Sequence, residues 1–445
     1  MLKAILRREI LEYLISPKFL IGISLAVVLM VTSTVINLAN YRQRQQDYID
    51  AQRDLKGDRA TTTIVRGPRP LSVLVQGLDR KLGTKMEVSS WGIPASLSGY
   101  MGYYTSDHLR FLSGFEAVDF AFIVRVIFSL MVIFLAYNSV SEEKSQGTLG
   151  LVLSHSVPRD QLLLGKFLGG LFVIVGSMLI SALLSFLILV LGRSIALSRE
   201  DWERIAAILL FSVLYLITFY SLSLFVSVLV NRPSIALMIL LQVWIFLVVI
   251  YPNLGVVIAS NFYRLPSQEE VAQQKEAAFQ TYEAEYHRIE KDLHDSYSSG
   301  KRPDKSLGLR NAELSAIHAE CVYKVDQDFN RRLTEQVALA RRAAFLSPAV
   351  LFDTGTTRLA RTDLNDYERF MSGVLDLWQS HVENTKLLYK DIAAFRKAKL
   401  PPYRYASESR ADSFSAVLPQ ALSLFFIGVI FFMLAHVSFL KKDVR

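Results

Sequence analysis

The sequence is poor in charge and almost free of cysteine. Only 20% of its 445 residues are charged, whereas 51% are hydrophobic, and the mean hydropathy is +0.30. A soluble protein of this size normally carries more charge and fewer aliphatic residues, so an ordinary soluble enzyme is not expected. The single cysteine, Cys321, cannot form an intrachain disulfide, and no Cys/His cluster has metal-ligand spacing. The sequence therefore predicts neither a disulfide scaffold nor a zinc module.

Motifs of nucleotide binding and of membrane-embedded catalysis are also missing. The sequence contains no G-x-x-x-x-G-K-[ST] loop, no H-E-x-x-H motif and no pair of intramembrane aspartates. The pair Gly165-Lys166 is followed by Phe167 inside a hydrophobic run, where no phosphate-binding loop can form. We therefore expect no enzyme activity in this chain, and we predict no catalytic residue, no metal site and no cofactor.

Long hydrophobic runs are what the sequence has instead. A bilayer core needs about 20 apolar residues per helix, and six runs reach this length. They are 19–38, 118–137, 167–191, 205–230, 234–251 and 413–440. In residues 1–18, apolar side chains such as Leu2, Ile5 and Ile10 share one face of an amphipathic helix. The sequence predicts an α-helical polytopic membrane protein with six transmembrane helices and an N-terminal interfacial elbow helix.

The charges predict the orientation of these spans. With the N-terminus inside, the short cytoplasmic segments carry eleven basic and six acidic residues, whereas the connection 193–204 carries three of each. The positive-inside rule expects such an excess in short cytoplasmic segments. We therefore predict a protein of the bacterial cytoplasmic (inner) membrane with both termini, including the tail 441–445, in the cytoplasm. The net charge of +8 then reflects membrane anchoring, and no nucleic-acid partner is predicted.

Two large segments are predicted to lie outside the cytoplasm. Segment 39–117 begins as a helical continuation of the first span and then alternates β-branched residues with Gly and Pro, which predicts short strands. Segment 252–412 predicts a mostly helical domain with three long helices, over 267–296, 307–346 and 364–399. The pattern leaves open whether these helices bind an extracytoplasmic partner or form a solvated stalk.

The segment 138–166, between the second and third spans, is predicted to be cytoplasmic. Ser141 can cap a short helix whose first turn holds Glu142 and Glu143, and Leu149 gives that helix an apolar face. Pro158 then forces a break before the third span. A short helix followed by a polar knuckle can receive a push from a soluble partner, although a plain surface helix would have the same pattern.

This segment resembles the corresponding connection of ABC-2 type transporter permeases. The family pattern is a Glu, a few residues, Gly-Thr-Leu, a Leu-rich turn, a Pro/Ser knuckle, Arg and finally Gly-Lys. It is matched by Glu143, Gly147, Thr148, Leu149, Leu151, Leu153, Ser154, Pro158, Arg159, Gly165 and Lys166. The knuckle departs from the family, because Ser156-Val157-Pro158 places the proline last where many relatives place it first. Arg8-Glu9 with Ser16-Pro17-Lys18-Phe19 is similar to the family's elbow, and PRPLSVLVQGLD resembles a subgroup with large inserts, related to copper-enzyme maturation and gliding-motility permeases.

The resemblance implies the permease subunit of an ATP-driven ABC-2 exporter. ATP would be bound and hydrolysed by a separate ABC ATPase subunit, and a second permease subunit, identical or paralogous, would complete the complex. The implied ATPase-coupling residues are Glu142, Glu143, Gly147, Thr148, Leu149, Pro158 and Arg159. Since the spans hold few charges, we expect an apolar or amphipathic cargo. The alternative is a force-transmitting or partner-binding protein whose outer helices act on an extracytoplasmic protein without translocating a substrate.

Two polar residues in the spans are the candidates for a translocation path. Arg125 lies deep in the second span, where a charge is costly and usually faces protein or water, although its side chain could instead snorkel to the headgroups. Gln242 in the fifth span could line the path or could hydrogen-bond between helices. Asp119 is expected at the membrane interface.

Overall fold

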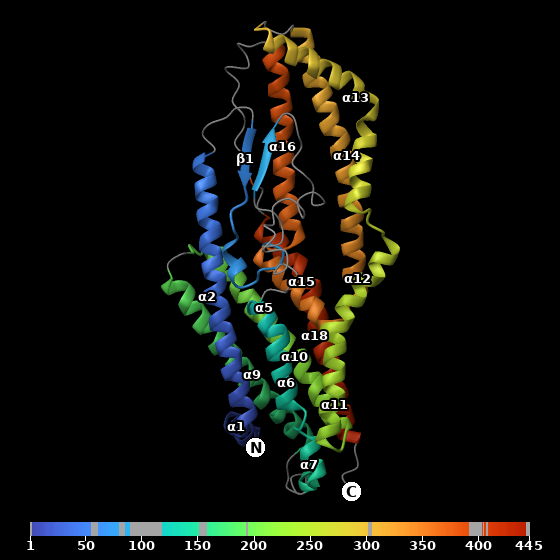
Figure 1. Cartoon of the computed structure of the whole chain (residues 1–445). Coiled ribbons are helices and arrows are strands. Elements are labelled where there is room, and N and C mark those ends of the chain that lie inside the picture. The colour runs from blue at the N-terminus through green and yellow to red at the C-terminus, as the bar shows by residue number, and fades with distance from the viewer. Residues whose placement is uncertain are drawn as a thin grey trace.

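The computed structural model describes residues 2–54, 61–79, 85–89, 118–150, 158–192, 195–300, 305–390, 403, 405 and 408–441. They form a bundle of long helices that continues at one end into a helical extension (Figure 1). The first helix begins and the last helix ends at the other end of the bundle. We call these two ends of the bundle the extension end and the terminal end.

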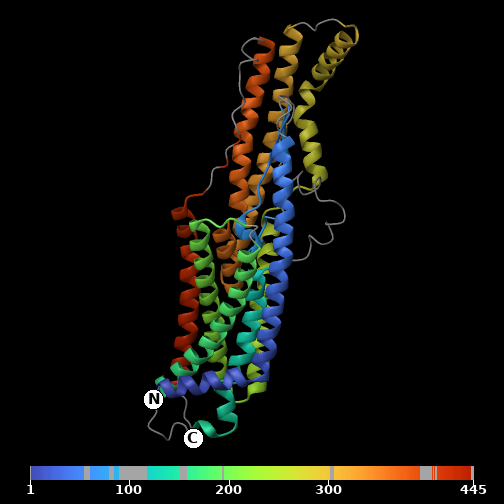
Figure 2. The ribbon, with the colours of Figure 1, turned by 90° about the vertical axis from the view of Figure 1, so that its left-hand side faces the viewer.

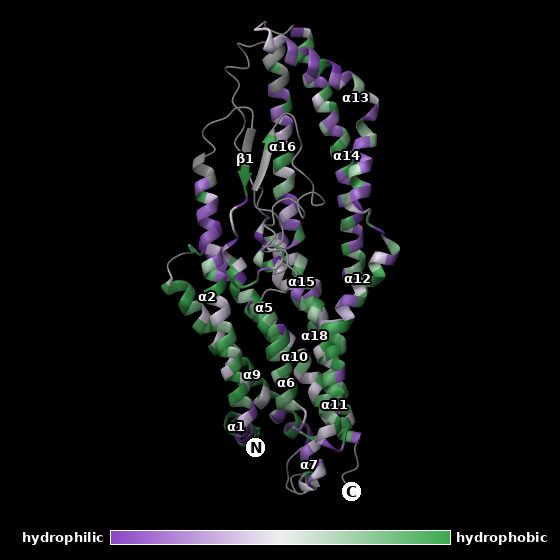
Figure 3. Ribbon diagram, viewed as in Figure 1, coloured by the Kyte–Doolittle hydropathy of each residue, from purple (hydrophilic) through white to green (hydrophobic). Residues whose placement is uncertain are grey.

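Six helices of the described residues are long and apolar enough to cross a membrane. Four of them are single helices, namely α2 (Pro17–Asp54), α9 (Arg159–Leu191), α10 (Arg199–Leu229) and α18 (Arg410–Lys441). The second span joins α5 (Phe120–Phe122), η2 (Ile123–Phe128) and α6 (Ser129–Ala136), and the fifth joins α11 (Pro233–Trp244), η3 (Ile245–Ile250) and α12 (Tyr251–Phe262). Hydrophobic residues cover the bundle, whereas the extension is largely hydrophilic (Figure 3). The structure confirms the predicted fold class, a helical polytopic membrane protein.

Two of the spans contain a π-helical turn, η2 and η3. In the fifth span the helix does not stop near Tyr251, where the predicted run ends, but continues to Phe262. Pro252 stands in the first turn of α12, directly after η3, where the widened backbone tolerates a residue without an N–H. The proline that ends the hydrophobic run therefore does not end the helix.

The N-terminal helix α1 (Leu2–Ile15) lies across the spans at the terminal end (Figure 2). It packs on α9 at two glycines that allow the helices to approach closely. A Cβ atom at Gly165 would lie 2.7 Å from Ile5 Cγ2, and one at Gly169 would lie 2.8 Å from Glu9 Cβ. Both separations are shorter than real Cβ contacts, so larger residues at these positions would push α1 away from α9.

The extension consists of long helices and one small β-hairpin. Helices α13 (Gln268–Ser298) and α14 (Lys305–Ala343) pack side by side, and α16 (Leu364–Lys390) packs on α14. The predicted end of the third helix, Lys399, lies outside the described residues. Strands β1 (Thr61–Val65) and β2 (Lys85–Ser89) pair antiparallel, and Val88 is buried beside α16.

A further helix, α15 (Pro348–Ala360), lies inside the bundle and not in the extension. It packs between α10 and α18, where the ring of Phe352 stacks on Tyr215 with 4.7 Å between ring centroids. The Ser347 hydroxyl caps its N-terminus and also donates to the Leu247 carbonyl in the fifth span, at 2.6 Å. The predicted outer segment 252–412 thus includes a helix, α15, that packs within the bundle, and the turn before α15 contacts the fifth span.

Candidate coupling site and the extension end of the bundle

A short helix, α7 (Ser141–Ser145), projects at the terminal end of the bundle (Figure 1). Glu142 and Glu143 stand in its first turn, and Gly147 follows the helix with a positive φ of 70°. A side chain at this backbone conformation would be strained, which explains the glycine. Gln146 and Gly147 are exposed, and a Cβ atom at Gly147 would meet nothing within 4 Å. The tip of α7 is therefore an open surface.

Lys144 ties α7 to the end of the fourth span. Its Nζ lies within hydrogen-bonding distance of the carbonyl oxygens of Ser227 (3.4 Å), Val228 and Val230 (3.5 Å). The last carbonyls of a helix have no partner inside the helix, so a lysine there satisfies them and complements the helix dipole. The backbone N–H of Ser141 donates to Ser227 Oγ at 3.1 Å. The side chain of Lys144 and the backbone of Ser141 therefore both connect α7 to the end of α10.

A buried group of three charges joins α7 to α1 and α9. Lys166 Nζ lies 2.8 Å from Glu9 Oε1 and 2.9 Å from Glu143 Oε1. The exposed fractions of these side chains are 5% for Lys166, 9% for Glu9 and 19% for Glu143. Burial raises the pKa of Glu9, and the charge and hydrogen bond of Lys166 oppose that rise. We call Glu9, Lys166 and Glu143 the charge triad.

The backbone of Lys166 is held as well. The Tyr220 hydroxyl of α10 donates to the Lys166 carbonyl at 3.1 Å, and the Tyr13 hydroxyl of α1 lies 3.5 Å from that of Tyr220. Separating one charge of a buried ion pair from its partner typically costs about 3–5 kcal/mol. A displacement of α7 is therefore expected to move α1 and α9 with it.

The other predicted coupling residues lie at the same end of the bundle. Thr148 Oγ1 donates to the Glu143 carbonyl at 3.3 Å, and Leu149 is buried beside Leu162 and Leu163 of α9. Pro158 is the N-cap of α9, and Arg159 Nη1 donates to the Leu440 carbonyl of α18 at 3.0 Å. Residues 151–157, which include Leu151, Leu153, Ser154 and the Ser156-Val157 part of the knuckle, lie outside the described residues.

Sequence reasoning missed two parts of this site. Lys144 has no place in the family pattern, and Glu9 was assigned only to the elbow. A lysine directly after two glutamates in a short helix indicates no target by itself, because its acceptors lie 83 to 86 residues away. Lys166 was the available clue to the role of Glu9, since a lysine at the start of a hydrophobic span needs an acidic or polar partner.

We expect Gly169→Leu to detach α1 from α9, because the new side chain would occupy the space of Glu9 Cβ. Overpacking of this kind costs about 1–3 kcal/mol. The thermal unfolding temperature of the purified protein should fall, and protease cleavage within α1 should become faster. Gly176→Leu in the same helix is the matched control, since a Cβ atom there meets nothing within 4 Å. Equal effects of both substitutions would contradict this packing role.

At the extension end, Arg125 contacts α15. Arg125 Nη1 lies 3.4 Å from Asp353 Oδ1, and the Arg125 carbonyl accepts the Tyr215 hydroxyl at 2.9 Å. Gln242 is exposed on α11, and within the described part of the chain no hydrogen bond or ion pair joins it to Arg125. Asp119 caps α5, where its carboxylate accepts the N–H of Phe122 at 2.8 Å. The structure does not bring the two candidate path residues together.

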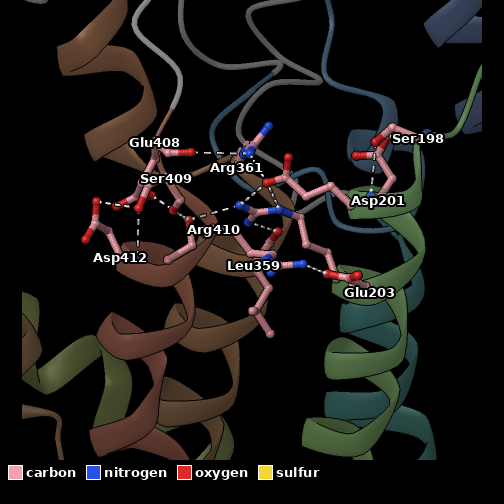
Figure 4. A network of polar contacts seen from close by, with 12 residues as sticks. Ser198, Asp201, Glu203, Leu359, Arg361, Glu408, Ser409, Arg410 and Asp412 are labelled. Atoms are coloured by element: carbon pink, nitrogen blue, oxygen red, sulfur yellow. Dashed lines mark hydrogen bonds and ion pairs between the residues drawn. The ribbon is translucent and has the colours of Figure 1, made fainter.

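A network of charges holds the outer part of α15 between α10 and α18 (Figure 4). The fully buried Arg204 of α10 donates to the Leu359 carbonyl at 3.0 Å and to Ser413 Oγ at 3.1 Å. Arg361, which caps α15 in the left-handed conformation, contacts the Glu200 carboxylate. These contacts join three helices that are far apart in the sequence.

Glu408 connects the same network to α16. Its carboxylate pairs with Arg358 of α15 and with Arg369 of α16, the latter at 2.6 Å, and accepts the Ser413 hydroxyl at 2.9 Å. Burial alone would raise the pKa of Glu408, but the hydrogen bonds from Arg369 and Ser413 and the charge of Arg358 hold it below its ordinary value. The extension is therefore tied to the bundle by ionised groups.

Six apolar spans, an N-terminal helix that lies across them and a short helix that projects at the terminal end define a polytopic helical membrane protein. The sequence profile of the ABC-2 family transporter proteins matches residues 3–444, so the chain belongs to this family. The family consists of membrane components of ABC transporters and implies an ATPase partner. No curated protein sequence matches the chain.

Proposed function

We propose that this chain is the permease subunit of an ATP-driven exporter and that α7 receives the movement of a separate ATPase. The charge triad is the observation that supports this proposal best, because it connects an exposed tip to buried parts of two other helices. A coupling element needs a surface that a soluble partner can contact. It also needs contacts to the rest of the protein whose separation costs several kcal/mol of free energy.

The proposed movement spreads from α7 by four separate contacts. Glu143 acts through Lys166 on α9 and, through the same lysine, on Glu9 of α1. Lys144 acts on the end of α10, and Arg159 links the start of α9 to the end of α18. A displacement at the tip of α7 would thus reach three spans and the elbow helix together. The ATPase would bind and hydrolyse ATP, and this chain needs no cofactor of its own.

The proposal places the terminal end, with α7, in the cytoplasm of a bacterium and the extension outside its inner membrane. The excess of basic residues in the short segments at the terminal end supports this orientation. A second permease subunit, identical or paralogous, would complete the complex. The proposed cargo is apolar or amphipathic, because the spans offer few charges and Arg125 is already paired with Asp353.

We expect Gln146→Trp to weaken binding of the ATPase by at least about tenfold, since a bulky ring at the tip of α7 would obstruct a docked partner. Gln146 is exposed, so the fold of the permease should not change. Co-purification of the ATPase with the permease and the ATPase activity of the complex measure the effect. Gln146→Ala is the control and should behave as the wild type. Normal binding by the tryptophan variant would remove α7 from the ATPase interface.

The second candidate function is force transmission to an extracytoplasmic protein without transport. The network around Glu408 favours it, because Arg369 of α16 and Arg358 of α15 share one carboxylate. A movement of the spans would then be carried into the extension. The two candidates differ in what the far part of the α13–α14 hairpin contributes.

Replacing residues 283–317 with a short Gly/Ser turn tests that contribution. The change removes the apolar contacts of Ile289, Leu293 and Leu314 but keeps Phe279 beside His318, whose ring centroids are 4.4 Å apart. We expect the shortened protein to enter the membrane and to bind its ATPase, because the spans and α7 are unchanged, but to lose its biological output. Full output would contradict any role of the hairpin tip.

Arg125→Leu is the matched variant within the spans. If cargo passes beside Arg125, output should fall while the extension stays intact. If the protein only transmits force, output should survive the substitution. Together the two variants separate export from force transmission.

A further inference from the structure

A cavity of about 170 Å³ lies at the extension end of the bundle, where α14, α15, the start of α16 and α18 meet. It is separate from the charge triad, which lies at the terminal end. A cavity of about 150 Å³ can hold a benzene-sized molecule, so this space can accept a chemical group of similar size. Its lining combines charged and polar side chains, which we call the polar wall, with apolar side chains, which we call the apolar wall.

The polar wall carries net positive charge. Two arginines, Arg341 and Arg358, and a single acidic residue, Asp363, line the cavity. Arg358 is paired with Asp363 at 2.9 Å and also contacts Glu408. Arg341 is exposed, and no ion pair joins it to another residue in the part of the chain that the structure describes. The cavity therefore has a guanidinium group available for an anion.

The apolar wall includes a side chain from an exposed turn. Phe345, in the turn between α14 and α15, is 46% exposed, and the neighbouring Leu346 is 72% exposed. Ala416 of α18 adds to the apolar lining, and Gln420 of the same helix adds an amide group. An anion alone has no use for the apolar side, whereas an amphiphile can occupy both walls.

The depth of the cavity matches the boundary between headgroups and acyl chains. Counting about 20 residues per bilayer core from Lys441 at the terminal end of α18 leads to Gln420. The same count from Pro233 leads to Tyr251 and Asn253, and the Tyr251 hydroxyl donates to the Ala343 carbonyl, two residues from Arg341. Arg341 thus lies at headgroup level and Phe345 at the edge of the hydrocarbon.

We propose that this cavity binds an anionic phospholipid from the leaflet on the extension side. Its phosphate would contact Arg341, and the upper part of an acyl chain would lie along Phe345 and Ala416. The charge of Arg341 favours an anionic lipid over a zwitterionic one, whose own cation would be repelled by this guanidinium group. The site can be examined on the permease alone, without an ATPase, so its test does not depend on export.

Native mass spectrometry of the full-length protein, exchanged from mixed micelles of phosphatidylglycerol and phosphatidylcholine, measures the binding. We expect wild-type protein to retain phosphatidylglycerol about tenfold more than phosphatidylcholine, and Arg341→Gln to remove this preference. Arg342→Gln is the matched control, because this exposed neighbour does not line the cavity. Ala416→Trp fills the cavity and should displace the lipid from a protein that keeps both arginines.

Two results would overturn the proposal. Equal loss of the preference in Arg341→Gln and Arg342→Gln would mean that the lipid responds to surface charge in general. Retention of phosphatidylglycerol by Ala416→Trp at the wild-type level would mean that the lipid lies elsewhere.

Discussion

Lys166→Met is expected to destabilise the protein by about 3–5 kcal/mol and to abolish coupling to the ATPase. The substitution keeps the length of the side chain but leaves the buried carboxylate of Glu9 and the partly buried carboxylate of Glu143 without their cation. Those carboxylates would repel each other, and α7 would lose its contact with α1 and α9. Thermal unfolding of the purified permease measures the loss of stability, and ATP hydrolysis by the reconstituted complex measures coupling.

A neutral version of the charge triad separates stability from coupling. Combining Lys166→Met with Glu9→Gln and Glu143→Gln removes all three charges, and replacing a buried ion pair by neutral groups of similar size is often without cost. We expect the triple variant to regain most of the stability but little of the coupling. Wild-type stability and wild-type coupling of Lys166→Met alone would refute the role of the triad.

Gly355→Leu is expected to expel α15 from the bundle, at a cost of about 3 kcal/mol. A Cβ atom at Gly355 would lie 2.3 Å from Phe211 Cε1 and 2.6 Å from Phe211 Cζ, so any side chain requires the Phe211 ring to move or the two helices to separate. Once α15 is displaced, Arg204 loses the Leu359 carbonyl and is left buried. We expect loss of biological output with normal binding of the ATPase, because α7 lies at the opposite end of the bundle.

The contact between Gly355 and Phe211 provides the control for this prediction. Phe211→Ala creates space where the leucine of Gly355→Leu would sit, so the double variant should recover stability relative to Gly355→Leu alone. The thermal unfolding temperatures of the wild type, both single variants and the double variant give the coupling energy. Strictly additive effects would show that α15 does not pack on Phe211 in the membrane.

The spans could be predicted from the sequence because their physical requirement is local. A helix that crosses a bilayer needs only enough apolar residues in one run, and the helices α9 and α10 satisfy this without reference to the rest of the chain. The elbow helix could be predicted for the same reason, from the apolar face of residues 1–18. The fifth span was predicted to end at Tyr251, but its helix continues through Pro252 after the π-helical turn.

The sequence did not predict that helix α15 lies in the bundle and not in the extension. Its sequence, PAVLFDTGTTRLA, mixes threonines, glycine and charge with apolar residues and resembles a surface segment. Its position depends on partners that are distant in the sequence, such as Arg204, which is 155 residues from Leu359. A pattern of hydropathy contains no information on such pairs.

The sequence predicted which segment holds the candidate coupling site but not which residues of other helices this segment contacts. The motif around Glu143 and Gly147 indicated the segment, because its residues are neighbours along the chain. The pairing of Glu143 with Lys166 and of Lys166 with Glu9 depends on three helices meeting, and the second pair is 157 residues apart. The sequence therefore supplied the residues of the site, and the structure supplied the reason for their types.

Site-specific photocrosslinking in living cells tests the central claim most directly. A photoreactive amino acid would replace Gln146 at the tip of α7 or, in a second strain, Ser298 at the far end of α13, both of which are exposed. We predict that position 146 captures a protein whose peptides contain the G-x-x-x-x-G-K-[ST] loop of an ATPase, and that position 298 does not. Capture of the ATPase from position 298, or its absence at position 146 in cells that contain the intact complex, would contradict both the orientation and the coupling role proposed for this chain.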